Sequence, residues 1–454
     1  MTTAKLVELK DNELPKGWAA STLGEIASYV QRGKSPKYTE HSELPVVNQK
    51  CVRWHGVDRD HVKYIHPEQF EKWEEKRFLQ NGDLLWNSTG TGTIGRAAIA
   101  QLKDGERLVV DSHVTIVRSA EGIEPKYVHY WVMGPAVQNS IAAMQSGSTN
   151  QVELSKGAVE STPIPVAPLE QQKRIVAKIE ELFSHIDAGI EALNKAKQLL
   201  KQYRQSVLKA AVTGEHTKEW REQNKCSSGE LIESLEEHLS STFSLYKKGK
   251  NSGWIEIVLK DISTRVSVGH VGKTTEFYCE KDEGIPFLRS QNVKPGRVIF
   301  EGTKYITPAF HKSLKKSQLQ EGDLLIVRVG ANRGDATVLP EIKGEINCAN
   351  IVFARTPKSV SGYLDLYFQS ELWTGLVDGL TTGTAQGVIN TKTVEKVQLD
   401  IPPLKEIKEI VNQMEIKQVA ISRLENEINS QLLKAGKNKQ SILASAFSGR
   451  LIDA

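Results

Sequence analysis

The sequence contains no run of about 18 apolar residues that could span a membrane, and its first residues, MTTAKLVELKDNELP, lack the apolar core of a secretion signal. Its four cysteines (Cys51, Cys226, Cys279 and Cys348) form no CxxC pair, so neither a zinc site nor a disulfide framework is indicated. An excess of charge of one sign is also missing, because +4 on 454 residues permits nucleic-acid binding without indicating it. We expect a cytoplasmic protein with reduced thiols.

Recognisable catalytic motifs are absent as well. The sequence has no HExxH, no GxSxG, no Asn-Pro-Pro-aromatic motif and no credible two-metal cluster, and a lone histidine such as His113 is more often a packed or surface residue than a ligand. We therefore predict no catalytic residue, no metal site and no cofactor site in this chain, which favours a binding protein over an enzyme.

Two glycine-rich stretches partly match the sequence motifs of nucleotide-binding loops. GTGTIG, beginning at Gly90, fits the dinucleotide fingerprint, but RAAIAQL follows it where a helix start must hold the pyrophosphate. GHVGKTT, beginning at Gly269, resembles a phosphate loop, but Ser267 stands where the first glycine belongs. We interpret the first stretch as a turn between strands and the second as a basic loop.

What the sequence does contain is an internal repeat. QSVLKAAVTG, beginning at Gln205, matches QSILASAFSG, beginning at Gln440, at five of ten positions. Further pairs follow in the same order: KGWAASTLGEI with SGWIEIVLKDI, NGDLLWNSTG with EGDLLIVRVG, QSGSTNQVELS with TTGTAQGVINT, and PIPVAPLEQQKRIVAKIE with VQLDIPPLKEIKEIVNQME. The chain is thus a tandem duplication with a period of about 235 residues, a sign of repeated architecture.

Each half ends in a proline cluster followed by a long helical pattern, predicted over about Glu170–Val212 and about Lys405–Phe447. Apolar residues recur at alternating spacings of about three and four, as in a coiled-coil seam. The predicted seam consists of Ile175, Ile179, Leu182, Ile186, Leu193, Leu200, Tyr203 and Val207, and of Ile410, Met414, Ile421, Leu424, Ile428 and Leu432.

Each apolar stripe needs a partner, and we expect the two helices to pair antiparallel with each other as a rod of about 60 Å. In the alternative, each stripe packs into a separate globular core. The halves are joined by a polar linker, residues 215–251, in which ELIESLEEHLSSTF predicts one short amphipathic helix. Before each long helix, about 150 residues of short mixed strand and helix patterns predict an α/β (mixed α+β) module.

Polar and basic loops occur at equivalent places in both modules. Arginine pairs with guanine edges, Asn and Gln pair with adenine edges, and Lys and hydroxyl groups hold phosphates. The candidate DNA-binding residues are Asn48, Gln49, Lys50, Arg53, Trp54, Asn87, Ser88, Thr89, Thr91 and Arg96 in the first module, and Arg289, Ser290, Gln291, Asn292, Lys294, Arg297, Arg328, Asn332 and Arg333 in the second. The alternative is that these are ordinary polar loops.

The chain resembles a type I restriction–modification specificity subunit along essentially its whole length. The resemblance is carried by the paired modules that open with Gly17-Trp18 and Gly253-Trp254 and by the GDLL turns at Gly82 and Gly322. It is carried further by APLEQQKRIVAKIE and PPLKEIKEIVNQME, and by the two helix endings, the first followed by TKEWRE. The second helix departs mildly, with Lys417 at a seam position and AGKNK late in the seam.

The resemblance implies two target-recognition domains separated by two long antiparallel helices, a coiled-coil spacer with a pseudo-two-fold internal repeat. The implied divisions are domain 1 (1–165), the central long helix (166–214), the linker (215–251), domain 2 (252–401) and the C-terminal long helix (402–454). Such subunits bind a bipartite, asymmetric site on double-stranded DNA, one half per domain.

The resemblance also implies partners. The paired helices would dock two methyltransferase subunits, which bind S-adenosylmethionine and flip adenines out of the duplex. Restriction/translocase subunits that use ATP and magnesium would join them in a bacterial or archaeal cytoplasm, with no membrane partner. Two rivals stay open: a coiled-coil protein–protein scaffold without DNA readout, and a single-chain modification enzyme that uses the Gly90 turn or the Gly269 loop.

Overall fold

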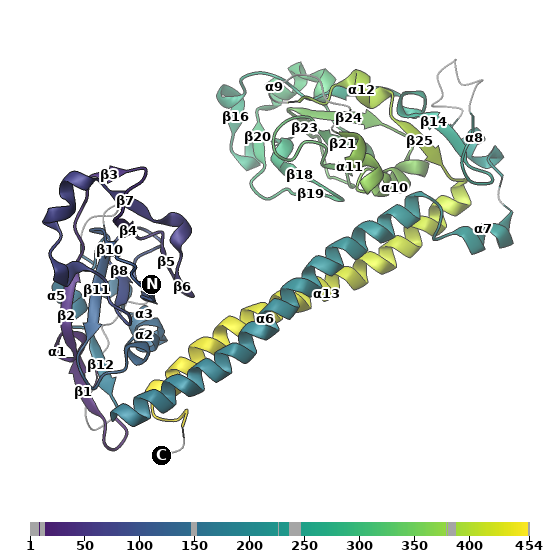
Figure 1. Cartoon of the computed structure of the whole chain (residues 1–454). Coiled ribbons are helices and arrows are strands. Elements are labelled where there is room, and N and C mark those ends of the chain that lie inside the picture. The colour runs from purple at the N-terminus through teal and green to yellow at the C-terminus, as the bar shows by residue number, and fades with distance from the viewer. Residues whose placement is uncertain are drawn as a thin grey trace. The chain divides into compact units, whose positions relative to one another are not determined.

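The computed structural model describes residue 9 and residues 14–146, 152–225, 227–235, 247–377, 379 and 387–452 (Figure 1). Two compact units are present, and each is described by itself. Unit 1 comprises Met1–Asn194 and Asn429–Ala454, and unit 2 comprises Lys195–Ile428. Each unit therefore contains one module together with one end of each long helix. No helix in the described ranges is both long and apolar enough to cross a membrane.

The centre of unit 1 is an antiparallel sheet of four strands in the order β2-β11-β8-β9. These strands are β2 (Ala27–Arg32), β11 (Val114–Ser119), β8 (Leu84–Asn87) and β9 (Ala97–Ile99). All of β8 is buried: Leu84 and Trp86 enter one hydrophobic core, and Leu85 enters another on the opposite face. A strand covered on both faces has a continuous apolar sequence, which explains the run LLW.

A second sheet has the order β10-β4-β7-β3, in which only β10 and β4 pair in parallel. Its strands are β10 (Val109–Val110), β4 (Pro45–Val47), β7 (Lys63–Ile65) and β3 (Tyr38–Thr39). Two short antiparallel pairs complete the strands: β1 (Ala19–Thr22) with β12 (Pro163–Val166), and β5 (Val52–Arg53) with β6 (Gly56–Val57).

The helices of the first module are short. They are α1 (Leu23–Ile26), α2 (Pro125–Met133), α3 (Pro135–Gln138), α4 (Ile141–Met144) and α5 (Lys156–Glu160), with 3-10 turns at Arg59–His61, Pro67–Lys72 and Glu75–Arg77. Proline at the first position of α2 costs no hydrogen bond, because the N–H of the first helical residue has no partner within the helix. Helix α2 buries Tyr127, Val128, Trp131 and Val132, and so joins the sheet to the long helices.

Unit 2 repeats this plan and adds one strand. Its central sheet has the order β15-β24-β21-β22, built from β15 (Arg265–Val268), β24 (Ile351–Arg355), β21 (Asp323–Val327) and β22 (Ala336–Val338). Its second sheet has the order β16-β20-β17-β23, built from β16 (Tyr278–Cys279), β20 (Lys304–Ile306), β17 (Ile285–Leu288) and β23 (Asn347–Cys348). The duplication predicted from the sequence is confirmed.

The smaller elements of unit 2 follow the same order. Strand β14 (Ile255–Val258) pairs with β25 (Gln398–Ile401) and with an added strand, β13 (Lys247–Lys248), and β18 (Val293–Lys294) pairs with β19 (Arg297–Val298). The helices are α9 (Pro308–Ser313), α10 (Lys358–Tyr367), α11 (Glu371–Val377) and α12 (Thr391–Glu395), with 3-10 turns at Leu259–Ile262, Thr275–Phe277, Lys281–Glu283, Ser290–Asn292 and Lys315–Ser317.

The two GDLL turns contain the same buried pair of an aspartate and an arginine. Asp83 is fully buried and accepts hydrogen bonds from Arg118 Nε and Nη2 at 2.7 Å each. Asp323 is buried in the same way and accepts from Arg355 Nε at 2.8 Å and Nη2 at 2.9 Å. Such forked pairs are among the stronger hydrogen-bonded contacts in proteins, and each fastens its turn to the central sheet.

The two predicted long helices are confirmed as α6 (Leu169–Val212) and α13 (Leu404–Phe447), with 44 residues each. The repeat offset of 235 residues relates them from the first residue to the last. Past their ends, Gly214 and Gly449 both have φ of +75°, the left-handed conformation in which glycine has no steric penalty.

The long helices pair antiparallel, because α6 starts and α13 ends in unit 1, while unit 2 contains the reverse. In unit 1, Lys439 Nζ lies 2.5 Å from Asp187 Oδ1, and Phe447 joins Ile175 and Ile179 in one core. In unit 2, Arg204 Nη2 lies 3.0 Å from Glu425 Oε2. The antiparallel pairing is confirmed, and each helix end packs with its module into a common core.

The predicted seam is correct near the ends of the helices and wrong at two positions. Ile175, Ile179, Leu200, Val207, Ile410, Met414 and Ile421 are buried, and Leu182, Ile186, Leu193, Ile428 and Leu432 are half-buried. Tyr203 and Leu424 are exposed instead. The next residue on each helix, Arg204 and Glu425, faces the other helix instead, and the two form an ion pair.

The linker contains two helices among its described residues, α7 (Lys218–Asn224) and α8 (Gly229–Leu235), whereas the sequence predicted one. The predicted amphipathic helix is present as α8, and the remainder of that prediction, residues 236–243, lies outside the described residues. Leu231 and Leu235 are fully buried in the core of unit 2. The polar sequence KEWREQN of α7 was missed because it lacks an apolar stripe.

A repeated hydrogen bond fixes the start of each module to the start of a long helix. In unit 1, Trp18 Nε1 donates to Gln171 Oε1 at 2.9 Å. In unit 2, Trp254 Nε1 donates to Glu406 Oε2 at 2.9 Å, and Glu406 is fully buried. The repeat relates Gln171 to Glu406, so unit 2 replaces a neutral amide with a carboxylate that needs further partners.

Helix α7 supplies those partners. Thr217 Oγ1 donates to Glu406 Oε1 at 2.7 Å, and Arg221 pairs with the same carboxylate while it also donates to Gly214 O at 2.9 Å. The linker is therefore anchored to the start of α13 by a buried ion pair.

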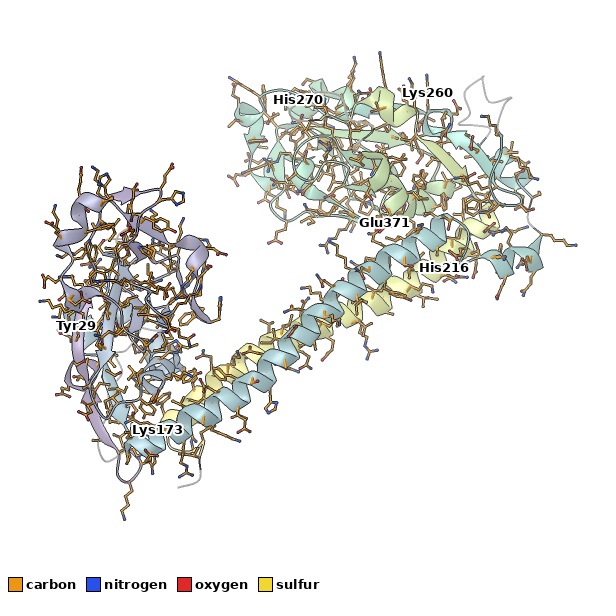
Figure 2. The ribbon with its side chains drawn as sticks, in the orientation of Figure 1. Tyr29, Lys173, His216, Lys260, His270 and Glu371 are labelled. Atoms are coloured by element: carbon orange, nitrogen blue, oxygen red, sulfur yellow. The ribbon has the colours of Figure 1, made fainter. Side chains whose placement is uncertain are left out.

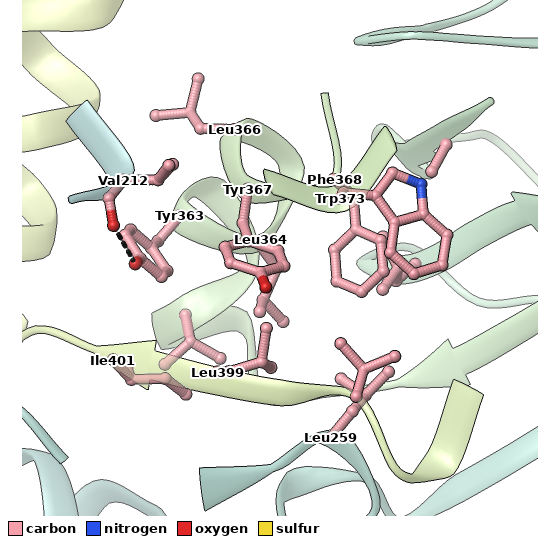
Figure 3. Close-up of a cluster of buried hydrophobic side chains, with 14 of the residues drawn as sticks. Val212, Leu259, Tyr363, Leu364, Leu366, Tyr367, Phe368, Trp373, Leu399 and Ile401 are labelled. Carbon is pink, nitrogen blue, oxygen red and sulfur yellow. Dashed lines mark hydrogen bonds between the residues drawn. The ribbon is translucent and has the colours of Figure 1, made fainter. Parts of the chain in front are cut away.

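Figure 3 shows the core that surrounds the end of α6. Tyr363 donates its hydroxyl hydrogen bond to Val212 O at 3.1 Å and also contacts Asp400 O at 2.6 Å. Burial raises the pKa of Tyr363, so the neutral phenol that donates these bonds is the form present at physiological pH. In unit 1, Tyr127 donates in the same way to Pro165 O at 2.7 Å.

Candidate nucleic-acid interface

In unit 1, the loops that leave β4 and β8 meet at one edge of the module. Asn87 Nδ2 donates to Gln49 O at 2.9 Å, and Thr93 Oγ1 donates to Gln49 Oε1 at 3.0 Å. The loop before β11 joins them, because Thr89 Oγ1 lies 2.6 Å from His113 Nδ1. Residues far apart in the sequence thus form one polar loop cluster, which we call loop cluster 1 (residues 32–37, 48–54, 87–96, 111–113 and 152–155).

The turn GTGTIG lies inside this cluster and joins β8 to β9. Gly90, Gly92 and Gly95 all have positive φ, at 94°, 84° and 85°. A side chain at Gly90 would also collide with Gln49, since a Cβ there would lie 2.3 Å from Oε1. No helix follows, because β9 begins at Ala97. The interpretation as a turn between strands is confirmed, and the dinucleotide fingerprint lacks the helix it needs.

The candidate DNA-binding residues of unit 1 are exposed, half-buried or buried. Lys50, Trp54 and Thr91 are exposed, and Gln49, Arg53, Thr89 and Arg96 are half-buried. Arg96 Nη2 donates to Gly92 O at 2.9 Å, which closes the glycine turn, and Arg53 Nε lies 3.6 Å from Asp58 Oδ2. The exposed side chains are the ones free to reach a ligand without rearrangement.

Asn48, Asn87 and Ser88 are buried, and each makes a side-chain hydrogen bond within the loops, although Asn87 Oδ1 accepts none. Asn48 Nδ2 donates to His61 O at 2.6 Å, and its Oδ1 accepts from the backbone N–H of Lys50 at 2.8 Å. Ser88 Oγ lies 2.5 Å from Thr115 Oγ1. None of the three presents its side chain at the surface, and their contact with DNA stays a prediction.

Unit 2 builds an equivalent loop cluster 2 (residues 269–274, 289–297, 328–335, 348–350 and 387–389). Ser290 Oγ donates to Asn350 O at 3.3 Å, Ile389 N donates to Arg328 O at 3.1 Å, and Arg333 Nη1 donates to Gly387 O at 3.3 Å. Gln291 and Arg297 are exposed, whereas Arg289, Ser290, Lys294, Arg328, Asn332 and Arg333 are half-buried.

Asn292 is the buried member of the candidate residues in loop cluster 2. It accepts from the backbone N–H of Arg289 at 2.9 Å and donates to Ile299 O at 2.8 Å. It therefore supports the hairpin β18–β19. On the other side of this hairpin, Lys294 Nζ lies 3.9 Å from Asp335 Oδ2, and burial raises the pKa of Asp335 more than Lys294 lowers it.

The sequence analysis did not count the loops that follow β2 and β15 among the candidate DNA-binding loops. Gly33 and Gly269 occupy equivalent places, and a Cβ would lie 2.1 Å from Asp111 O in the first and 2.8 Å from Cys348 O in the second. Only glycine allows this close approach, which brings Lys34 and His270 into the clusters. His270 N donates to Cys348 O at 2.8 Å, and Figure 2 labels this residue. The signal in the sequence was a glycine at the same place in both halves, followed by Lys34 in one and by His270 in the other.

GHVGKTT, the stretch that resembles a phosphate loop, forms the loop that follows β15. The backbone turns into the 3-10 segment Thr275–Phe277, so no long helix begins there. Lys273 is exposed. This loop is a basic part of loop cluster 2, as expected from the sequence.

Acidic groups in loop cluster 1 are paired or buried. Arg32 Nη1 lies 2.8 Å from Glu153 Oε2, and its Nε donates to Ser112 O. Asp111 is buried and accepts from Tyr38 Oη at 3.2 Å, and burial raises its pKa. Among the described residues, no three His, Cys, Asp or Glu side chains are arranged to hold a metal ion. The accessible chemistry of the cluster is thus cationic, amide, hydroxyl and aromatic, which suits phosphates and base edges.

Comparison with known proteins gives one consistent result. Residues 15–199 match the family model described as type I restriction modification DNA specificity domain. The chain is 22% identical over 452 residues to the EcoKI type I restriction enzyme specificity subunit of Escherichia coli strain K12, covering 97% of this chain and 90% of that protein. It is 24% identical over 451 residues to the StySPI specificity subunit of Salmonella potsdam, with the same coverage of 97% and 90%.

A solved structure agrees on the fold. A chain from work on complex assembly and conformational transition of the type I R-M system superposes with a TM-score of 0.68 at 18% identity, covering 96% of this chain and 99% of that chain. At this level of identity the likeness shows the fold alone. The two modules and the paired helices described above are thus a known architecture.

Proposed function

We infer that this chain, a member of the type I restriction–modification specificity subunits, selects the DNA sequence on which its complex acts. The observation that carries the inference is the duplication of one loop cluster on two modules that share a helix pair. A binding protein with two divergent copies of one polar loop cluster is suited to recognise two separate parts of one linear target. Double-stranded DNA is such a target, because its grooves repeat along one axis.

We propose that loop cluster 1 reads one half of a bipartite, asymmetric site and loop cluster 2 reads the other half. Exposed Lys50 and Arg297 suit phosphates, while Gln49, Gln291 and Arg289 carry the donors and acceptors that base edges recognise. The clusters differ in sequence although their folds match. Different sequences on the same backbone are what two different half-sites require.

The partners and cofactors belong to the same proposal. Two methyltransferase subunits would dock on the paired helices and supply S-adenosylmethionine chemistry, and restriction/translocase subunits would use ATP and magnesium. This chain would contribute no catalytic residue and no cofactor of its own. Its place of action would be the bacterial or archaeal cytoplasm, where the DNA is.

The helix pair offers a direct test of how the spacer is set. Insertion of seven residues after Lys195 in α6 and seven after Lys434 in α13 keeps the heptad phase and lengthens both helices by about 10 Å. We expect the spacer of the recognised site to grow by about three base pairs, at about 3.4 Å per base pair, with both half-sites unchanged. Motif mapping by single-molecule sequencing of methylated DNA measures both quantities. A longer helix pair with an unchanged spacer would reject this role for α6 and α13.

Lys50 allows a test of phosphate contact. It is exposed at the edge of loop cluster 1, and only its backbone N–H is held, by Asn48. Lys50→Ala is expected to weaken binding to all DNA sequences alike and to reduce the slope of log K against log salt by about one. Fluorescence anisotropy of the assembled complex at several salt concentrations would show this. A change in base preference would identify Lys50 as a base reader instead.

A further inference from the structure

Arg289 and Arg328 of loop cluster 2 are half-buried arginines without a partner among the described residues. The Nε atom of each is buried and makes no hydrogen bond there. Neither guanidinium forms an ion pair within the described ranges, whereas Arg355 of the same unit pairs with Asp323. Buried polar groups of folded proteins are normally hydrogen-bonded, so both side chains are available to an acceptor on a ligand.

The backbone brings these two arginines to one small part of loop cluster 2. Arg289 directly follows β17, which pairs with β23, and Arg328 directly follows β21, which pairs with β24. The turn Ala349–Asn350 joins β23 to β24, so both arginines lie beside it, each about one strand spacing of 5 Å away. Ser290 Oγ donates to Asn350 O at 3.3 Å, which holds the loop after β17 against this turn.

Unit 1 has no arginine at the equivalent places. Asn48 directly follows β4, which pairs in parallel with β10, and Ser88 directly follows β8, which pairs antiparallel with β11. Both side chains are buried and form hydrogen bonds within unit 1. The duplication has thus kept the backbone, while unit 2 carries two guanidiniums without a partner where unit 1 carries two short polar side chains with internal partners.

The surroundings of the two arginines are cationic. Asp335 is the one acidic residue within the five segments that define loop cluster 2, and Lys294 Nζ lies 3.9 Å from its Oδ2. Lys273 and Arg297 are exposed in the same cluster and suit phosphates. Arg289 and Arg328 differ from them, because each is half-buried at the end of a strand. A planar guanidinium in a fixed position suits a base edge, which must be met by two donors in a defined direction.

We propose that Arg289 and Arg328 each read a guanine in the half-site bound by loop cluster 2, through paired hydrogen bonds to O6 and N7 in the major groove. The proposal rests on the proposed function, which supplies DNA as the ligand. Bidentate pairing of arginine with guanine is the commonest specific contact between proteins and DNA. Loop cluster 1 lacks both arginines and selects its half-site through other side chains. The half-site of unit 2 therefore contains at least two G·C base pairs.

The test is to map the methylated motif of the complex with each arginine replaced. Arg289→Ala and Arg328→Ala should each remove the preference at one G·C position of the same half-site and leave the other half-site unchanged. A bidentate contact discriminates between bases by about five- to 150-fold, so discrimination at that position should fall by this factor in competition binding. Arg328→Gln should shift the preference at its position from guanine toward adenine, because glutamine pairs with N6 and N7 of adenine.

Arg297→Ala is the matched control, because Arg297 is an exposed arginine of the same cluster. It should weaken binding to all sequences alike and leave the motif unchanged. The shift expected for Arg328→Gln keeps the test independent of folding, since a misfolded unit 2 gains no new preference.

Two results would overturn the proposal: a native motif in which neither half contains two G·C base pairs, or variants of Arg289 and Arg328 that weaken binding to all sequences alike, as phosphate contacts do. Absence of any methylated motif with the native chain would instead overturn the proposed function.

Discussion

Replacement of residues 23–162 by the corresponding stretch of another specificity subunit is expected to change one half of the recognised motif completely and to leave the other half unchanged. These residues lie between β1 and β12, which pair from Ala19↔Val166 to Thr22↔Pro163 and close the module at its base. Loop cluster 1 lies entirely within the exchanged stretch. Loop cluster 2 belongs to the other unit and keeps its sequence and its fold.

The expected effect is large. A mismatched base pair weakens specific binding by roughly 1–3 kcal/mol, so a half-site with several wrong bases is bound more than about a hundredfold less well. Methylated-motif sequencing of cells that contain the hybrid and a methyltransferase subunit would report the new motif. The matched exchange is residues 259–397 of unit 2, between β14 and β25, and it should change only the other half. If either exchange alters both halves, the modules do not read independently.

Loss of Arg221 is expected to destabilise unit 2 by about 3–5 kcal/mol, because it leaves the buried carboxylate of Glu406 without its cation. Thr217 and Trp254 still donate hydrogen bonds to Glu406, but neither carries a charge. For a unit of this size, the loss corresponds to a decrease of roughly 6–20 °C in the unfolding midpoint. Thermal unfolding of the purified chain with Arg221→Ala measures it.

Unit 1 provides the control for this experiment, since Gln171 accepts from Trp18 without any ion pair. Glu406→Gln combined with Arg221→Met copies that neutral arrangement and should recover most of the lost stability. An Arg221→Ala variant that melts within about 1 °C of the parent would show that groups other than Arg221 stabilise the buried carboxylate of Glu406. Failure of the double variant to recover would mean that Arg221 acts through contacts other than the charge.

The long helices and the duplication were predictable because both depend on patterns that the sequence repeats. Proline clusters, glycine ends and the 235-residue offset all mark α6 and α13, and the structure begins and ends them within one residue of the prediction. The facing residues in the middle of the pair were not predictable from hydrophobicity. A strict heptad count selects Tyr203 and Leu424, whereas the charged neighbours Arg204 and Glu425 make the contact and form an ion pair.

The candidate interface was predictable as a set of loops and less so as a set of side chains. Polar sequence shows that a loop is not core, but the same asparagine can face solvent or hold a turn. Asn48, Asn87 and Asn292 hold turns, because backbone groups in tight loops need side-chain partners. Lys34 and His270 were missed because their position depends on the close packing of Gly33 and Gly269 against other strands.

The most direct measurement is expression of this chain with its cognate methyltransferase subunit in a bacterial host without DNA methylation, followed by single-molecule sequencing for modified adenines. We expect a split motif, two short half-sites separated by an unspecified spacer of fixed length. A stable complex that leaves no modified motif would contradict it. The paired helices would then dock partners without any reading of DNA by the modules, as in a protein–protein scaffold.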